Sequence, residues 1–211
     1  MKGSEILAHV DHTLLRPTAT WKEIKTLGEE ARRYRTASVC IPAGYVARFH
    51  DAFGASVPIC TVIGFPLGYD TTETKISAAR QAIADGAEEI DAVVSLTDVK
   101  NGDFPKVTAE IAALKNAAEE RILKIIVETC YLTEKEKIAL CQCVTEGDAD
   151  FIKTSTGFGT GGATLADVQL IKEVVGDRAK IKASGGIRNR ETALQYIDLG
   201  VSRIGASAIL V

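Results

Sequence analysis

The chain has 211 residues, of which 46% are hydrophobic, and a formal net charge of -3 at pH 7. This length supports one large core and leaves little room for a second, so we expect a single domain over residues 1–211. Acidic and basic residues are interspersed without runs of like charge, which argues against a nucleic-acid-binding surface.

The N-terminus and the cysteines indicate the compartment. Glu5, His9 and Asp11 interrupt the first apolar stretch too early for a secretory signal, and no segment reaches the length of a membrane span. The five cysteines are an odd number and lack the spacing of a small disulfide framework. We therefore expect a cytoplasmic protein with no membrane association and no disulfides.

Short β-branched segments alternate along the chain with longer helical segments. The first expected strand is the least clear of eight, and the strands are expected near residues 8–13, 37–41, 58–64, 89–94, 123–129, 150–155, 180–184 and 202–207. The last seven are apolar on both faces, which is typical of parallel strands that helices cover on one side and core covers on the other.

Three of the intervening helical segments have recognisable ends. One begins at Thr20, one ends at Gly86, and one runs from Asn189 to Gly200. Eight such units in about 200 residues predict an α/β protein with a closed (β/α)8 TIM barrel. A doubly wound open sheet is the alternative, but it usually has a glycine-rich turn after the first strand, and this chain has none there.

Three charged residues interrupt the predicted strands. Asp91, Lys153 and Lys182 each fall inside an apolar run, and catalytic groups of such barrels lie at the carboxyl ends of the strands. If their faces line the lumen, the two lysines converge from neighbouring strands and Asp91 projects toward the same space. The alternative interpretation is a buried ion-pair network without catalysis.

The charge count favours a reactive amine over a structural network. Two lysines and one aspartate leave a surplus positive charge, which is costly in a desolvated core. A free lysine has a pKa of about 10.4, and one charge about 5 Å away at an effective dielectric of about 20 lowers it by roughly 2.4. We expect Lys182 to bring Lys153 close to neutrality, although spacing alone leaves open which of the two is the nucleophile.

Glycine-bearing turns follow the last three predicted strands, at residues 155–162, 184–188 and 205–207. Backbone N–H groups in such turns bind anions, and barrels of this kind often hold phosphate there. Arg188 and the Ser207 hydroxyl are further candidate phosphate contacts. The three histidines, at positions 9, 12 and 50, are too few and too clustered for the usual zinc sites, so we expect no metal.

The motifs together resemble those of the 2-deoxyribose-5-phosphate aldolase family. The resemblance covers nearly the whole chain and is carried, in order, by DHTLL, SVCIP, CTVIGFPLG, EIDAVV, IVETCYLTEKEK, DFIKTSTGFGTGGAT, IKASGGIR and RIGAS. It implies a class I aldolase that cleaves 2-deoxy-D-ribose 5-phosphate reversibly to acetaldehyde and D-glyceraldehyde 3-phosphate, without a cofactor.

The resemblance also implies roles for individual residues. Lys153 would form the Schiff base, Lys182 would perturb it, and Asp91 would relay protons. The substrate-binding residues are expected to be Asp11, Cys40, Thr156, Gly157, Gly185, Gly186, Gly205 and Ser207, with the last four forming the phosphate cradle.

Two other functions fit a barrel with a phosphate site. One is a phosphosugar isomerase or epimerase, which would use a base and no Schiff base; the other is a catalytically silent barrel that binds a phosphorylated metabolite. The expected partners are small phosphorylated sugar and aldehyde substrates, with no nucleic acid and no membrane. A homodimer or a homotetramer is an open alternative to a monomer.

Overall fold

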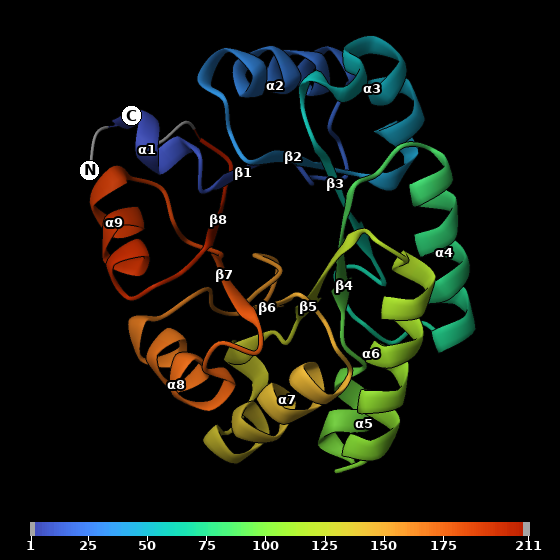
Figure 1. Ribbon diagram of the computed structural model, residues 1–211, viewed down its shortest axis with the longest axis vertical. Helices are drawn as coiled ribbons and strands as arrows, with labels where there is room; N and C mark the ends of the chain where they lie inside the picture. Colours follow the sequence, from blue (N-terminus) through green and yellow to red (C-terminus); the bar gives the residue numbers. More distant parts are fainter. Residues whose placement is uncertain (1–2, 209–211) are drawn as a thin grey trace.

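The computed structural model describes residues 3–208 and confirms the predicted (β/α)8 TIM barrel. Eight parallel strands close in sequence order, from β1 to β8 and back to β1, and helices surround them (Figure 1). The strands are β1 Val10–Thr13, β2 Ser38–Ile41, β3 Ile59–Ile63, β4 Glu89–Val93, β5 Ile122–Ile126, β6 Phe151–Lys153, β7 Lys180–Ser184 and β8 Arg203–Ala206.

The α-helices of the described residues begin at residues suited to that position. Thr20 and Thr133 each form a capping box with a glutamate three residues later, and Asn189 accepts a hydrogen bond from the Thr192 backbone N–H. The helices are α1 Gly3–Leu7, α2 Trp21–Tyr34, α3 Val46–Phe53, α4 Thr72–Ala84, α5 Leu96–Lys100, α6 Phe104–Ala118, α7 Glu134–Glu146, α8 Leu165–Val175 and α9 Arg190–Asp198. Within residues 3–208, none of them is long and apolar enough to cross a membrane.

The core has two layers because successive strand residues point to opposite sides of the barrel wall. Residues such as Ile90, Ile152 and Ala183 are fully buried and belong to the layer between strands and helices. Their neighbours along each strand point into the lumen, and many of these neighbours are charged. Strand register brings the charged residues level, since Asp91 lies opposite Lys124 and Lys153 lies opposite Lys182.

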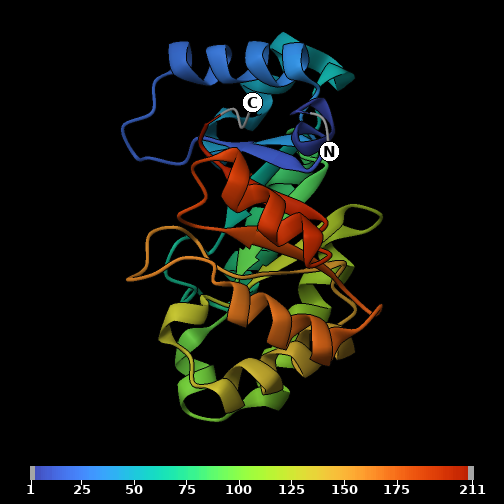
Figure 2. The same ribbon diagram turned by 90° about the vertical axis from the view of Figure 1, so that its left-hand side faces the viewer.

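All eight strands are parallel, so the segments that follow them project from one end of the barrel. Figure 2 shows this for the segments after β1 and after β6, which extend on the same side of the molecule. Catalytic residues of TIM barrels come from this end. The strand that is least clear in the sequence, β1, is also present, and its residues Asp11 and His12 contact Lys182 and Glu30.

Candidate active site

The three charged residues predicted from the strands meet at one carboxylate oxygen. Oδ2 of Asp91 accepts a hydrogen bond of 2.6 Å from Nζ of Lys153 and one of 2.7 Å from Nζ of Lys182. Because both amines contact the same oxygen, they lie within about two hydrogen-bond lengths of each other. All three side chains are at least 97% buried. The predicted convergence of the two lysines and Asp91 is therefore present.

Four further charged side chains extend this cluster. Lys124 donates to Oδ1 of Asp91 over 3.0 Å and also to Glu89, while Lys182 Nζ lies 2.5 Å from Asp11 Oδ2. Arg203 contacts both Glu89 and Asp11. The lumen thus holds four cations and three carboxylates, which are Lys124, Lys153, Lys182, Arg203, Asp11, Glu89 and Asp91.

The charges hold one another in the ionised state. Burial alone would raise the pKa of Asp91, but the three lysines around it hold that pKa well below its usual range. Burial would lower the pKa of Lys182, yet Asp11 and Asp91 raise it well above the usual value. The pKa of Lys124 is raised in the same way, against burial, chiefly by Asp91. In the resting enzyme Lys182 is therefore positively charged beside Lys153 throughout the neutral pH range.

Three members of this cluster, Lys124, Glu89 and Arg203, were not predicted from the sequence. Lys124 carries the same signal as Lys153, because it interrupts an apolar strand and is flanked by Leu123 and Ile125. Glu89 and Arg203 are the first residues of β4 and β8. They lie at the amino ends of the strands, where barrel enzymes do not place catalytic groups, so a search of the carboxyl ends passes over them.

A cavity of about 510 Å³ opens at the carboxyl ends of the strands, and Lys153 lines it. The residues predicted to bind substrate that also line it are Thr156, Gly157, Gly185, Gly186, Gly205 and Ser207. Arg188 and Arg16 contribute guanidinium groups, the second of which was not predicted. The glycine-bearing turns and the candidate nucleophile thus face one common space.

Glycine is required in the turn after β7 because two backbone segments meet there. Gly185 has a φ of +86°, and a Cβ on it would lie 2.9 Å from Cα of Gly162. Gly205 on β8 serves a different purpose: a Cβ there would lie 2.8 Å from Cβ of Ser184 and 3.5 Å from Cε of Lys182. The first glycine lets the turns approach each other, and the second leaves room for Ser184 at the end of β7.

Glu128 fixes the start of the segment after β6. It is 98% buried, and its carboxylate accepts a backbone hydrogen bond of 3.1 Å and a hydroxyl hydrogen bond from Thr156. Burial raises the pKa of Glu128, although the hydrogen bonds from Thr156 act in the opposite direction. The Thr156 hydroxyl in turn accepts a hydrogen bond from the Phe158 backbone. This clamp orders one wall of the cavity.

Cys40 is fully buried and lies below the cavity, next to the cluster, without lining the cavity. Its thiol, the Cys60 thiol and a carboxylate oxygen of Asp91 lie within 4.8 Å of one another, close enough to hold a metal ion. However, Cys60 and Lys124 already donate to Oδ1 of Asp91, over 3.1 and 3.0 Å. A cation bound there would face the Lys124 ammonium directly, so this donor set does not suit a metal.

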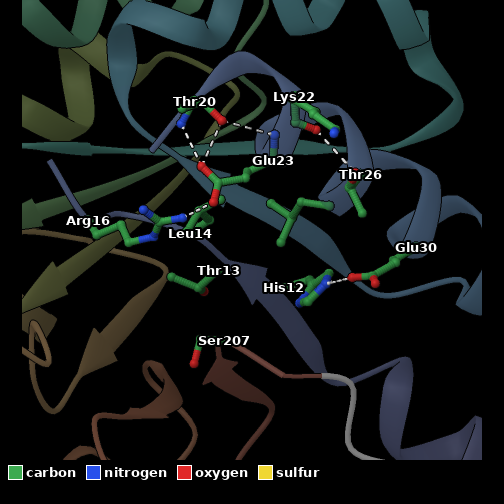
Figure 3. A pocket seen from close by; sticks show the side chains of 11 residues that line it. His12, Thr13, Leu14, Arg16, Thr20, Lys22, Glu23, Thr26, Glu30 and Ser207 are labelled. Carbon is green, nitrogen blue, oxygen red and sulfur yellow. Dashed lines mark hydrogen bonds and ion pairs between the residues drawn. The ribbon is translucent and has the colours of Figure 1, made fainter. Parts of the chain in front are cut away.

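A second cavity, of about 530 Å³, lies between β1 and α2 (Figure 3). On one side His12 Nε2 is 2.8 Å from Glu30, and on the other Arg16 forms an ion pair with Glu23. Ser207 lines both cavities. The charged cluster does not line this second cavity, which leaves the first as the candidate active site.

Comparisons with known proteins agree with this geometry. A sequence model described as DeoC/LacD family aldolase matches residues 6–210. The deoxyribose-phosphate aldolase of Clostridium botulinum (strain Alaska E43 / Type E3) is 56% identical over 207 residues, covering 98% of this chain and 94% of the relative. The deoxyribose-phosphate aldolase of Streptococcus agalactiae serotype Ia is 54% identical over 210 residues, covering 100% and 94%.

Solved structures are similar over the same length. The aldolase QR15 superposes with a TM-score of 0.94 at 38% identity, covering 97% of this chain and 92% of that one. The deoxyribose phosphate aldolase from Aeropyrum pernix, described as tetrameric, superposes with a TM-score of 0.92 at 28% identity, covering 99% and 89%. This chain is therefore an enzyme, and it belongs to the DeoC/LacD family of aldolases.

Proposed function

We propose that this aldolase reversibly cleaves 2-deoxy-D-ribose 5-phosphate to acetaldehyde and D-glyceraldehyde 3-phosphate by a class I mechanism, with Lys153 as the nucleophile. The observation that carries the proposal is the position of Lys153. Among the described residues, three lysines contact Asp91. Of these, Lys153 lines the cavity, whereas Lys182 and Lys124 are fully buried and do not line it. The names of the relatives support the choice of substrate.

The first half of the reaction builds an electron sink. The neutral amine of Lys153 attacks the aldehyde carbon of the open-chain sugar, and the carbinolamine loses water to give an iminium. Removal of the proton from the C3 hydroxyl then breaks the bond between C2 and C3. The electron pair of that bond moves into the iminium, which becomes an enamine, and D-glyceraldehyde 3-phosphate leaves.

The second half returns the enzyme to its starting state. The enamine takes a proton at C2 to become the iminium of acetaldehyde, and water hydrolyses it to release acetaldehyde and Lys153. Lys182, Asp91 and a water pass the protons. Since the pKa of Asp91 is held far below its usual range, its carboxylate mainly orients the two lysines and carries a proton only transiently.

The phosphate group fits the other end of the cavity. Exposed backbone N–H groups of the turns at Gly157, Gly185 and Gly186 form an anion-binding surface, and Ser207 adds a hydroxyl. Arg188 supplies a positive charge at the same wall. Phosphate at this end would direct the sugar aldehyde toward Lys153.

The proposal is tested by incubating the enzyme with 2-deoxy-D-ribose 5-phosphate and measuring both aldehydes. We expect acetaldehyde and D-glyceraldehyde 3-phosphate in equal amounts, and a loss of activity on the order of 10³-fold or more for Lys153→Arg. The matched control is Lys172→Arg, an exposed lysine on α8, which should keep full activity. Formation of an isomeric pentose phosphate without free aldehydes would show that the reaction is an isomerisation instead.

A further inference from the structure

Six of the lumenal charges form a closed ring in which positive and negative side chains alternate. The ring runs through Asp91, Lys124, Glu89, Arg203, Asp11 and Lys182 and returns to Asp91. Each link is an ion pair of 3.0 Å or less. Six residues from five strands are thus joined into one electrostatic unit, which we call the lumenal ring.

Glu89 and Arg203 form the part of the lumenal ring that is farthest from the cavity. Oε1 of Glu89 accepts from Nη2 of Arg203 over 2.7 Å, and Oε2 accepts from Nη1 over 3.1 Å, so the pair is bidentate. The Arg203 guanidinium also lies 5.9 Å from the centre of the Phe151 ring, which is 97% buried. Neither Glu89 nor Arg203 lines the cavity, so neither can touch substrate there.

The lumenal ring is electrically neutral, with three acids and three bases. Lys153 is the seventh charged group of the cluster, and it contacts the ring only at Asp91 among the described ion pairs. When Lys153 is protonated the cluster has one surplus positive charge, and when Lys153 is neutral the cluster is balanced. Lys153 is therefore the group whose proton adds the surplus charge to the cluster.

We propose that Glu89 and Arg203 are positioning residues of the aldolase reaction, which close the lumenal ring and set the charge balance against which Lys153 loses its proton. The inference rests on the proposed Schiff-base function. Arg203 acts through Asp11 on Lys182, and Glu89 acts through Lys124 on Asp91. Both paths end at a direct neighbour of Lys153.

Other ionisable groups also surround Lys153. Asp91 on β4 faces Lys153 directly. The other groups that face Lys153 or the Asp91 carboxylate are Lys182 on β7, Asp11 on β1, Cys40 on β2, Cys60 on β3, Lys124 on β5 and Glu128 just after β5. None of these residues is itself substituted in the Glu89 and Arg203 variants. Differences among the variants below therefore report the charge of the ring.

The test compares the acid limb of the pH profile of kcat/KM in two variants of opposite charge. Glu89→Gln makes the ring positive, which disfavours protonated Lys153, so the limb should move to lower pH. Arg203→Met makes the ring negative, so the limb should move to higher pH. A unit charge roughly 10 Å away at an effective dielectric of about 20 corresponds to a shift of about one pH unit in each case.

Two further variants separate charge from simple structural damage. Arg203→Lys keeps the charge and should restore the wild-type limb, and the double variant Glu89→Gln/Arg203→Met keeps the ring neutral and should do the same. Should Arg203→Met fail to fold, Glu89→Gln and the double variant still decide the question. Shifts in the same direction for both single variants, or no shift in folded variants, would overturn the inference.

A second readout does not depend on turnover. The rate at which trace acetic anhydride acetylates Lys153, followed by peptide mass spectrometry as a function of pH, should show the same opposite shifts. A wild-type enzyme that labels in this way but does not cleave deoxyribose phosphate would contradict the proposed function alone. Labelling profiles that are identical in all the variants would contradict the role of the lumenal ring alone.

Discussion

Lys153 differs in its surroundings from the three other lumenal cations, of which Lys124 and Lys182 are buried and Arg203 is partly buried. Lys124, Lys182 and Arg203 each contact at least two carboxylates, whereas Lys153 contacts Asp91 alone among the described ion pairs. Its charge is therefore the least compensated of the four.

This difference predicts unequal effects on stability for two lysine substitutions. Lys182→Met breaks the lumenal ring and leaves Asp11 short of a partner, so the free energy of unfolding should fall by about 3–5 kcal/mol. Lys153→Met removes the surplus charge, so the free energy of unfolding should stay within about 1 kcal/mol of wild type or rise. Urea unfolding at pH 7 measures both, and equal losses in the two variants would contradict the charge count.

How far the sequence predicts the site depends on what each residue contacts. Asp91, Lys153 and Lys182 could be predicted as site residues because each is a charged residue inside an otherwise apolar strand. In the sequence these two lysines and one aspartate have a surplus of one positive charge. The surplus is still one when all seven charged residues of the cluster are counted. What the sequence could not supply is the closure of the ring, because Glu89 meets Arg203 only through the barrel topology that joins β1 to β8.

At the scale of elements, the turn after β7 is the most constrained part of the cavity. Gly185 and Gly186 have similar φ values, +86° and +82°, but only Gly185 would clash with a neighbour on gaining a Cβ. Gly186→Ala should therefore cost about 1–2 kcal/mol for the backbone conformation alone. Gly185→Ala should cost more and also raise KM for the phosphorylated substrate, because the turn must shift.

Steady-state kinetics and thermal unfolding of the two alanine variants check this prediction. Since the backbone strain is nearly the same in both, Gly186→Ala is the matched control for Gly185→Ala. A KM increase that is equal in the two variants would mean that close approach to Gly162 does not shape the phosphate site.

The strands were predictable from sequence to different degrees for a physical reason. Seven have runs of apolar residues because helices cover one face and packed lumen covers part of the other. In β1, Val10–Thr13, the lumenal residue Asp11 joins the ring and His12 contacts Glu30 of α2. Because β1 has polar residues on both faces, its hydrophobicity pattern does not clearly predict a strand, even though β1 closes the barrel.

At the scale of the whole molecule, the ring links stability to pH. The lowered pKa values of Asp11 and Asp91 mean that their stabilising contribution is complete above the ordinary value of 3.8 and is lost as pH falls through the lowered values. The pKa values of Lys124 and Lys182 are raised. The stabilising contribution of these two lysines is therefore complete below the ordinary pKa of 10.5 and is lost as pH rises through the raised values. The ring should therefore stabilise the fold evenly across the neutral range.

A comparison of the enzyme with Asp91→Asn tests this linkage. The difference in free energy of unfolding between the two proteins should be present at about pH 5 and should shrink below about pH 4, where the Asp91 carboxylate begins to be protonated in the unfolded chain. Urea unfolding at a series of pH values gives this difference directly. A difference that does not shrink as the pH falls below about 4 would contradict the lowered pKa of Asp91.

Borohydride trapping decides whether Lys153 forms the Schiff base. The enzyme is treated with sodium borohydride in the presence of 2-deoxy-D-ribose 5-phosphate, and its peptides are analysed by mass spectrometry. We predict a reduced adduct on Lys153, which is absent without substrate and absent in Lys153→Ala. An adduct on Lys182 instead would make Lys182 the nucleophile, and no adduct while the enzyme turns over would mean that the reaction forms no Schiff base.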